Sequence, residues 1–253
     1  MISVIIVSWN VREYLDNCLA SVVKACKGLN SEIIVVDNAS QDKTTEMLKD
    51  KFPRIKIIAN KKNLGFGRAN NQGSRIAKGK YLLFLNPDTI VDRKAIRTLA
   101  SFLKSHPKAG LVGPEQLDEK GKAVFDFSHW SFKGILSYLI GKLWFLTTGK
   151  YKRFFSNPYQ TKLLNAGCWL VKQEVFEEIG GFNEELFLYG EEPDFCGRLR
   201  KAGYQIWFLR NCQIIHFREK SIEQTNKKKQ FFIKSYLKII KQFFTNQHSV
   251  FTR

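Results

Sequence analysis

The sequence lacks the features of a secreted or membrane-spanning protein. Its five cysteines form no CxxC pair, and because their number is odd they cannot all be joined in disulfides, which indicates a reducing, cytoplasmic interior. The first eight residues have no basic segment before their apolar run and are too short for a signal peptide, so we interpret them as a β-strand. The longest apolar stretch, residues 135–146, contains Lys142 and is shorter than the roughly 20 residues of a spanning helix. We therefore expect a cytoplasmic protein that touches a membrane at most peripherally.

Several nucleotide-binding and nucleic-acid-binding motifs are also missing. The sequence contains no GxxxxGK phosphate loop, and Asn70 stands where the third glycine of a dinucleotide fingerprint would be. It has no RNA-binding aromatic signature, zinc knuckle or basic zipper, so nucleic-acid binding is disfavoured despite a net charge of +18. A charge of that size still favours anionic partners, which leaves diphosphate-bearing substrates and anionic lipid.

The pattern of apolar residues predicts an α/β fold in one large domain. Over the first hundred residues, short β-branched runs alternate with amphipathic segments, which is typical of βα units around a parallel sheet. Further strands at 109–112 and 163–171 predict a mixed sheet, and the aromatic-rich stretch 125–159 is either a packed excursion or an interaction surface. The expected early strands are 3–7, 32–36, 55–59 and 81–85, and the expected helices are 12–27, 42–51, 67–77 and 93–105.

Polar residues follow the expected strands, at the sheet edge where such folds bind ligands. Asp37 and Asn38 come directly after a buried strand and can bind a ribose or a base, although the same pair is also typical of a turn. The loop 63–73 has two glycines, and its backbone N–H groups, together with Arg68, could approach a diphosphate. Each of these signals is weak when taken alone.

Two further strand ends offer metal ligands. Asp88 ends an Asn-Pro-Asp turn and is a candidate ligand for Mg²⁺ or Mn²⁺, with a plain turn as the alternative. His216 ends a later apolar strand and could complete the same site, although a single histidine is usually structural. The spacing in the sequence does not tell whether these two residues meet.

The acidic cluster Glu191-Glu192-Pro193-Asp194 is the strongest signal. Pro193 in a first helical turn, with carboxylates around it and basic residues toward the other end, suits the helix dipole, so the charges could serve only as capping. Three carboxylates within four residues also raise the pKa of at least one of them, as a general base near neutral pH requires. Capping and catalysis can coexist on one turn.

Together these segments resemble the family-2 glycosyltransferases of the GT-A fold, and within them the rhamnosyltransferase-like enzymes of bacterial surface-polysaccharide synthesis. The resemblance covers roughly residues 1–220, which we expect to form the GT-A domain, a Rossmann-like mixed sheet with flanking helices. Its motifs occur in order: Val7-Ser8-Trp9-Asn10, Val36-Asp37-Asn38-Ala39-Ser40, Asn63-Leu64-Gly65-Phe66, Asn86-Pro87-Asp88, Asn165-Ala166-Gly167, Gly180-Gly181-Phe182, Tyr189-Gly190-Glu191-Glu192 and His216.

The resemblance implies a role for each matching residue. Asp88 and His216 would bind a divalent metal, Mg²⁺ or Mn²⁺. The acidic turn would supply the base, with Glu192 in the position of the usual Asp and with Glu191 and Asp194 as its neighbours. The implied set that binds the nucleotide-sugar is Ser8, Asn10, Asp37, Asn38, Asn63, Gly65, Arg68 and Asn86.

The implied reaction is a single inverting displacement. Glu192 would take a proton from an acceptor hydroxyl while that oxygen attacks the anomeric carbon of a nucleoside-diphosphate sugar. The acceptor would be a glycan or a polyprenyl-diphosphate-linked sugar. The chain departs from the family pattern at Glu192, which is one methylene longer than Asp, and at Asn86, which leaves Asp88 as the only carboxylate of the metal turn. A catalytically inactive nucleotide-sugar-binding protein remains the alternative.

The C-terminal segment 221–253 is basic and amphipathic. Within 228–244, aromatic and aliphatic residues recur at helical spacing, and lysines fall largely on the other side. This pattern predicts a helix that lies on an anionic membrane surface or one that packs on the enzyme body, and the sequence favours neither.

Overall fold

The computed structural model describes residues 1–123 and 158–217. The basic C-terminal segment therefore falls outside the described residues, as does the aromatic-rich stretch apart from Pro158 and Tyr159, where the short strand β7 (Tyr159–Thr161) begins. Among the described residues, no helix has the length and apolar character needed to span a bilayer.

Alternating strands and helices build the N-terminal half, as predicted. The strands are β1 (Ile2–Ser8), β2 (Ser31–Asp37), β3 (Lys56–Ala59) and β4 (Tyr81–Leu85), and they pair in parallel in the order β3-β2-β1-β4. The helices between and after them are α1 (Arg12–Cys26), α2 (Thr44–Lys51), α3 (Phe66–Arg75) and α4 (Arg93–Ser105). Asp92 begins α4 by accepting a hydrogen bond from the N–H of Ala95 at 2.7 Å.

The rest of the sheet is mixed, which confirms the predicted change of pattern. Strand β8 (Cys168–Lys172) pairs antiparallel with both β4 and β6 (Ala109–Leu117), and β9 (Gln205–His216) lies parallel to β6. A two-residue strand, β5 (Thr89–Ile90), and β7 both pair antiparallel with β9. The prediction of a strand from residue 163 was wrong at its start, because Asn165 and Gly167 form a loop in which the Asn165 side chain bonds to the Gly167 N–H.

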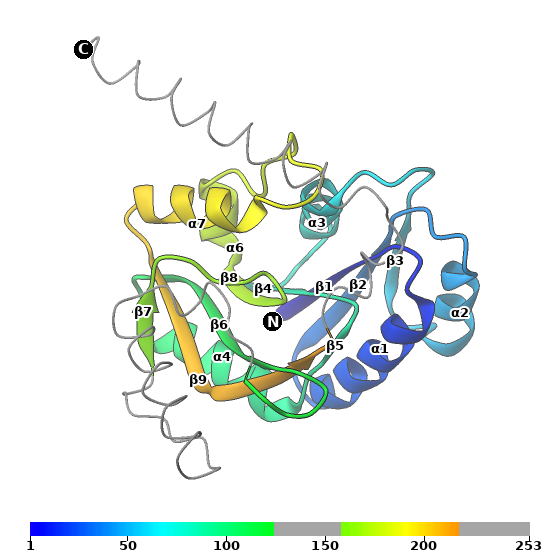
Figure 1. Cartoon of the computed structure of the whole chain (residues 1–253), viewed down its shortest axis with the longest axis horizontal. Coiled ribbons are helices and arrows are strands. Elements are labelled where there is room, and N and C mark those ends of the chain that lie inside the picture. Colours follow the sequence, from blue (N-terminus) through cyan, green and yellow to red (C-terminus); the bar gives the residue numbers. More distant parts are fainter. Residues whose placement is uncertain (124–157, 218–253) are drawn as a thin grey trace.

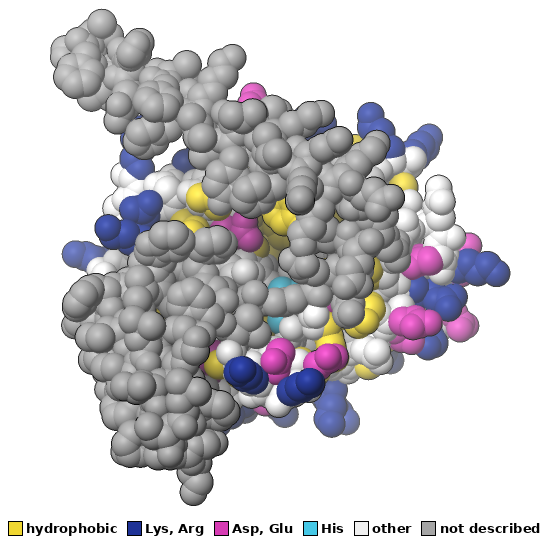
Figure 2. Space-filling model, in the orientation of Figure 1, with side chains coloured by type: hydrophobic (Ala, Val, Ile, Leu, Met, Phe, Trp, Pro, Cys, Tyr) yellow, Lys and Arg dark blue, Asp and Glu magenta, His cyan; other side chains and the backbone are white. Residues whose placement is uncertain are grey.

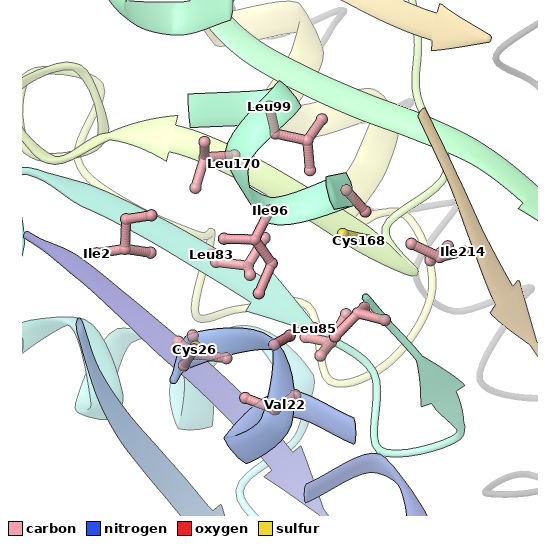
Figure 3. Close-up of a cluster of buried hydrophobic side chains, with 14 of the residues drawn as sticks. Ile2, Val22, Cys26, Leu83, Leu85, Ile96, Leu99, Cys168, Leu170 and Ile214 are labelled. Atoms are coloured by element: carbon pink, nitrogen blue, oxygen red, sulfur yellow. The ribbon is translucent and has the colours of Figure 1, made fainter. Parts of the chain in front are cut away.

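Helices cover both faces of the sheet (Figure 1). Successive strand residues point to opposite faces, so Leu83 joins a core beneath α1, α2 and α4, while Leu82 and Phe84 join a core beneath α3, α6 (Gln173–Glu178) and α7 (Glu191–Lys201). Figure 3 shows Ile96 of α4 beside Leu83, with Val22 of α1 in the same core. Each fully buried aliphatic side chain contributes about 1.5–3 kcal/mol, so the two cores hold the strand ends in fixed positions.

Candidate active site

The carboxyl ends of four strands lie along one edge of the sheet. Strands β1, β2 and β4 are parallel, and β9 runs in the same direction as β4 because two antiparallel pairings, through β8 and β6, separate β4 from the β6–β9 pair. The polar residues that follow these strands in the sequence are thus brought together. Figure 2 shows a histidine side chain in cyan and acidic side chains in magenta on the same face of the molecule.

Asp88 and His216 meet at this edge. The Oδ1 atom of Asp88 lies 3.2 Å from Nε2 of His216, and both side chains are almost completely buried. The N–H of Phe217 donates to the carbonyl oxygen of Asp88 at 3.0 Å, and Thr89 is the register partner of His216 in the β5–β9 pair. Backbone pairing therefore fixes the two side chains relative to each other.

The pair has the chemistry of a partial metal site. One carboxylate oxygen and one imidazole nitrogen are suitable ligands for a divalent ion such as Mn²⁺. Neighbouring ligands of an octahedral ion lie about 3 Å apart when each bond is about 2.1 Å, which agrees with the separation of these two atoms. Oδ1 of Asp88 is buried and accepts no hydrogen bond within the described part of the chain, so its ligand position is open. No group of three or more His, Cys, Asp or Glu side chains there forms a larger metal cluster.

Asn86 lies beside the same pair. Its side-chain nitrogen is 3.3 Å from Nε2 of His216, and its backbone N–H donates to the carbonyl oxygen of Gly167 at 3.1 Å. Asn86, which was predicted to bind the nucleotide-sugar, thus lies next to the two predicted metal ligands.

Ser8 and Asp37 lie side by side at the ends of β1 and β2. They are register partners, both are buried, and Ser8 Oγ and Asp37 Oδ1 have no hydrogen-bond partner among residues 1–123 and 158–217. The other carboxylate oxygen of Asp37 accepts from the Thr45 hydroxyl at 3.0 Å, which orients the group. Buried polar atoms are nearly always satisfied, so adjacent open ones point to a ligand.

Asn10 and Asn38 hold the loops around that ligand position. Asn10, with a positive φ of 54°, accepts from the N–H of Gln41 at 2.7 Å and so joins the loop after β1 to the loop after β2. Asn38 accepts from Asn60 at 2.9 Å and donates to the carbonyl oxygen of Gly65 at 3.2 Å. A cavity of about 660 Å³ opens beside these loops, lined by residues 10–14 and 41–43.

The first residues of the glycine-rich loop use their backbone N–H groups in hydrogen bonds within the protein. The N–H of Gly65 donates to the Asn63 side chain at 2.9 Å, and the N–H of Phe66 donates to the carbonyl oxygen of Phe187 at 3.0 Å. These amides are therefore not open to a diphosphate. Arg68 lies 3.4 Å from Glu184 through its Nε, and its side chain is half exposed. Through the Phe66–Phe187 hydrogen bond, the loop holds the segment that leads into the acidic turn.

The N-terminus of α7 carries the acidic turn. Tyr189 and Gly190 both have positive φ, 67° and 93°, and they turn the chain so that Glu191 is buried at the start of the helix. Burial, followed by the negative charge of Glu192, raises the pKa of Glu191 from 4.5 to about 8. One of its carboxylate oxygens has no partner in the described part of the chain. The expected pKa rise is therefore found on Glu191.

The other two carboxylates have different surroundings. Asp194 accepts from Nη2 and Nε of Arg198 at 2.6 and 3.0 Å, one turn along the same helix, so we assign it a structural role. Glu192 is only partly buried, which leaves its carboxylate the more accessible of the adjacent pair.

Asn71 has a role that sequence reasoning did not predict. Its side chain accepts from the N–H of Phe182 and donates to the carbonyl oxygen of the same residue, both at 2.9 Å, and it also donates to Glu184 at 3.0 Å. The feature of the sequence that could have indicated this role is the position of Asn71 in the early part of α3. It fastens the Gly180-Gly181-Phe182 motif to α3, ahead of the acidic turn.

The fold and this edge define a class, the glycosyltransferases of GT-A type. The family model for glycosyl transferase family 2 matches residues 3–180, and the chain belongs to that family. The acidic turn and His216 lie beyond the matched residues. The chain is accordingly a glycosyltransferase.

Curated relatives agree with this assignment, and a solved structure shares the fold. The chain is 24% identical over 238 residues to the N-acetylglucosaminyl-diphospho-decaprenol L-rhamnosyltransferase of Mycobacterium tuberculosis, covering 87% of this chain and 77% of that protein. It is 24% identical over 204 residues to the dTDP-rhamnosyl transferase RfbF of Shigella flexneri, covering 78% and 64%. A mannosyltransferase from Pyrobaculum calidifontis, solved with GDP-Man and Mn²⁺, superimposes with a TM-score of 0.65 at 17% identity, covering 95% of this chain and 64% of that one.

Proposed function

We propose that this glycosyltransferase is an inverting, divalent-cation-dependent enzyme. It transfers a sugar from a nucleoside-diphosphate sugar to a hydroxyl of a glycan or of a polyprenyl-diphosphate-linked acceptor. One observation carries the proposal: among the described residues, Ser8, Asp37, Asp88 and Glu191 each have a buried side-chain oxygen that has no hydrogen-bond partner. All four are site residues expected from the sequence.

The first two of these residues would bind the nucleoside. Asp37 and Ser8 offer a carboxylate oxygen and a hydroxyl where β1 and β2 end, so they can hydrogen-bond to a ribose or to a base. Asn10, Asn38 and Asn63 would keep the surrounding loops in place by the hydrogen bonds already described.

Asp88 and His216 would hold the metal ion, with Asn86 beside them. A bound divalent ion would supply positive charge that stabilises the departing nucleoside diphosphate. Mn²⁺ fits this ligand set better than Mg²⁺ because one ligand is an imidazole nitrogen, whereas Mg²⁺ prefers oxygen ligands. The described residues offer two protein ligands for such an ion, and the donor diphosphate would supply further oxygen ligands.

Glu192 would act on the acceptor. As the accessible carboxylate of the pair, it would take the proton from the acceptor hydroxyl as that oxygen attacks the anomeric carbon, and the bond from that carbon to the diphosphate would break. Glu191, which is protonated at neutral pH with a pKa near 8, would serve as a hydrogen-bond donor in the site. The reaction would invert the configuration of the anomeric carbon.

The names of the relatives suggest where to begin the search for substrates. A relative named for dTDP-rhamnose and another named for a decaprenol-linked acceptor support testing dTDP-rhamnose and polyprenyl-diphosphate-linked N-acetylglucosamine first. Thermal stabilisation by dTDP-, UDP- and GDP-sugars, each with Mn²⁺, tests the donor class. We expect one nucleotide series to raise the melting temperature; no stabilisation by any of them would contradict the proposal.

The basic segment 228–244 would keep the enzyme at an anionic membrane surface, where a lipid-linked acceptor resides. Its lysines and apolar residues suit such a surface. The lipid character of the acceptor named for the mycobacterial relative supports this part of the proposal.

A further inference from the structure

The second ring nitrogen of His216 contacts a residue that is neither a metal ligand nor a predicted substrate-binding residue. Nδ1 of His216 lies 2.8 Å from Oε1 of Gln116, and both side chains are buried. Gln116 lies on β6, where it is the register partner of Ile214 in β9. The glutamine thus reaches the imidazole from the neighbouring strand, on the side opposite to Asp88.

The other end of the Gln116 amide fixes its orientation. Its Nε2 lies 3.4 Å from the carbonyl oxygen of Asn165, which also accepts from the indole N–H of Trp169 at 2.7 Å. A carbonyl oxygen can only accept hydrogen bonds, so the NH₂ end of the amide faces Asn165 and the oxygen faces His216. An amide oxygen in turn can only accept, so Nδ1 of His216 must carry the proton.

In the neutral ring, this tautomer leaves a lone pair on Nε2, the nitrogen that faces Asp88. The side-chain nitrogen of Asn86, 3.3 Å away, is placed to donate to that lone pair. Metal-binding histidines generally have their second nitrogen held by an acceptor in this way, which sets both the ring orientation and the basicity of the ligand nitrogen.

Because Gly167 has no side chain, His216 and Gln116 can approach each other beside it. A Cβ on residue 167 would lie 2.6 Å from Nδ1 of His216 and 2.9 Å from Nε2 of Gln116. Any larger residue would separate the two side chains, so the Asn165-Ala166-Gly167 loop fits around the hydrogen-bonded pair.

We propose that Gln116 is a positioning residue for the metal ligand His216. By accepting from Nδ1–H it selects the tautomer whose Nε2 can bind a divalent ion and holds the ring toward Asp88. The inference rests on the metal site of the proposed function, and it assigns to that site a residue outside its ligand set.

Two variants of the full-length protein separate this role from a packing role. Gln116→Met keeps the approximate size and removes the strong acceptor, whereas Gln116→Glu keeps an acceptor for Nδ1–H. Gln173→Met, at a partly exposed glutamine whose side chain bonds only to Glu177 in the described contacts, is the matched control. Circular dichroism of metal-free protein checks that each variant folds.

The first readout needs no metal. Long-range ¹H–¹⁵N spectra of histidine-labelled protein distinguish the two neutral tautomers. We expect the Nδ1–H tautomer for His216 in wild type, Gln116→Glu and Gln173→Met, and a mixture in Gln116→Met. An Nε2–H tautomer in wild type, or an unchanged spectrum in Gln116→Met, would overturn the proposal.

The second readout is the affinity for Mn²⁺ alone, measured by electron paramagnetic resonance. Gln116→Met should weaken Mn²⁺ binding about 10- to 100-fold, while Gln116→Glu and Gln173→Met should stay within a few-fold of wild type. Equal losses in Gln116→Met and Gln116→Glu would assign the residue to packing and overturn the proposal. Asp88→Asn distinguishes a failure of the metal site from a failure of the role of Gln116. If this variant binds Mn²⁺ as tightly as wild type, the metal site itself is contradicted, whatever the result for the Gln116 variants.

Discussion

Gly65 lies against the backbone carbonyl group of Phe187, and the neighbouring N–H of Phe66 donates to that carbonyl oxygen at 3.0 Å. A side chain at residue 65 would collide with this carbonyl group. The contact joins the glycine-rich loop to the segment that leads into Glu191, so the loop supports the acidic turn.

Replacement of Gly65 by alanine should therefore impair both stability and catalysis. Residue 65 has a positive φ of 86°, which costs an alanine roughly 1 kcal/mol, and the collision should add about 1–3 kcal/mol. Gly203→Ala is the matched control, because residue 203 has nearly the same φ, 87°, and open space around the added Cβ. Urea unfolding and donor turnover are the measurements. We expect Gly65→Ala to be the less stable of the two and to lose about 100-fold in turnover; equal behaviour of both variants would contradict the supporting role.

Glu191 should make the stability of the protein depend on pH. Its pKa is raised from 4.5 to about 8 in the folded state, so between these values the folded protein holds a proton that the unfolded chain has lost. Stability should therefore fall as the pH rises from about 5 to 8, by on the order of 3 kcal/mol. Gln cannot ionise, so Glu191→Gln should remove this slope.

The measurement is urea unfolding of metal-free protein at pH 5, 6.5 and 8. Glu174→Gln, at an exposed carboxyl on α6, is the control and should follow wild type. Parallel stability curves for wild type and Glu191→Gln would contradict a raised pKa at Glu191.

Glu192 should be required for transfer and dispensable for donor binding. Glu192→Gln removes the proton acceptor, so release of nucleoside diphosphate from the donor should fall about 10²- to 10⁴-fold, while donor affinity changes by a few-fold at most. Glu192→Asp restores a carboxylate and should recover part of the rate. If Glu192→Gln turns over like wild type, the base lies elsewhere, and Glu191 becomes the next residue to test.

Local patterns predicted much of the fold. The alternating apolar runs and amphipathic segments placed the four parallel strands, and residues 81–85 and 93–105 match β4 and α4 at both ends. The strand expected from residue 163 failed because the Asn165 loop is held by a contact with Gln116, 49 residues away in the sequence, which no local window contains.

The site was predictable where it depends on strand ends. Asp88 follows β4 and His216 ends β9, and the order of the strands then brings them together. The hydrogen bond from the Phe66 N–H to Phe187 was not predictable, because the two residues are far apart in the sequence. The raised pKa of Glu191 depends on burial, which the charges of the turn do not reveal. Composition indicates which groups are present, and tertiary contacts determine which of them remain open to a ligand.

The C-terminal segment should bind anionic membranes. Full-length protein should co-sediment with phosphatidylglycerol vesicles and leave them at high salt, because lysine attraction is screened. Protein that lacks residues 222–253 should stay in the supernatant, and neutral phosphatidylcholine vesicles serve as the control. Unchanged sedimentation of the truncated protein would count against a membrane-binding tail.

The central claim is that the edge formed by Ser8, Asp37, Asp88 and His216 binds a nucleoside diphosphate together with a divalent ion. Calorimetric titration of dTDP, UDP and GDP into wild type and Asp88→Asn, each with and without Mn²⁺, tests it most directly. We expect one nucleotide to bind wild type at least about tenfold more tightly with Mn²⁺, and Asp88→Asn to lose that gain while its metal-free affinity stays nearly the same. The absence of binding by any nucleotide, or an Mn²⁺ gain that persists in Asp88→Asn, would contradict the claim.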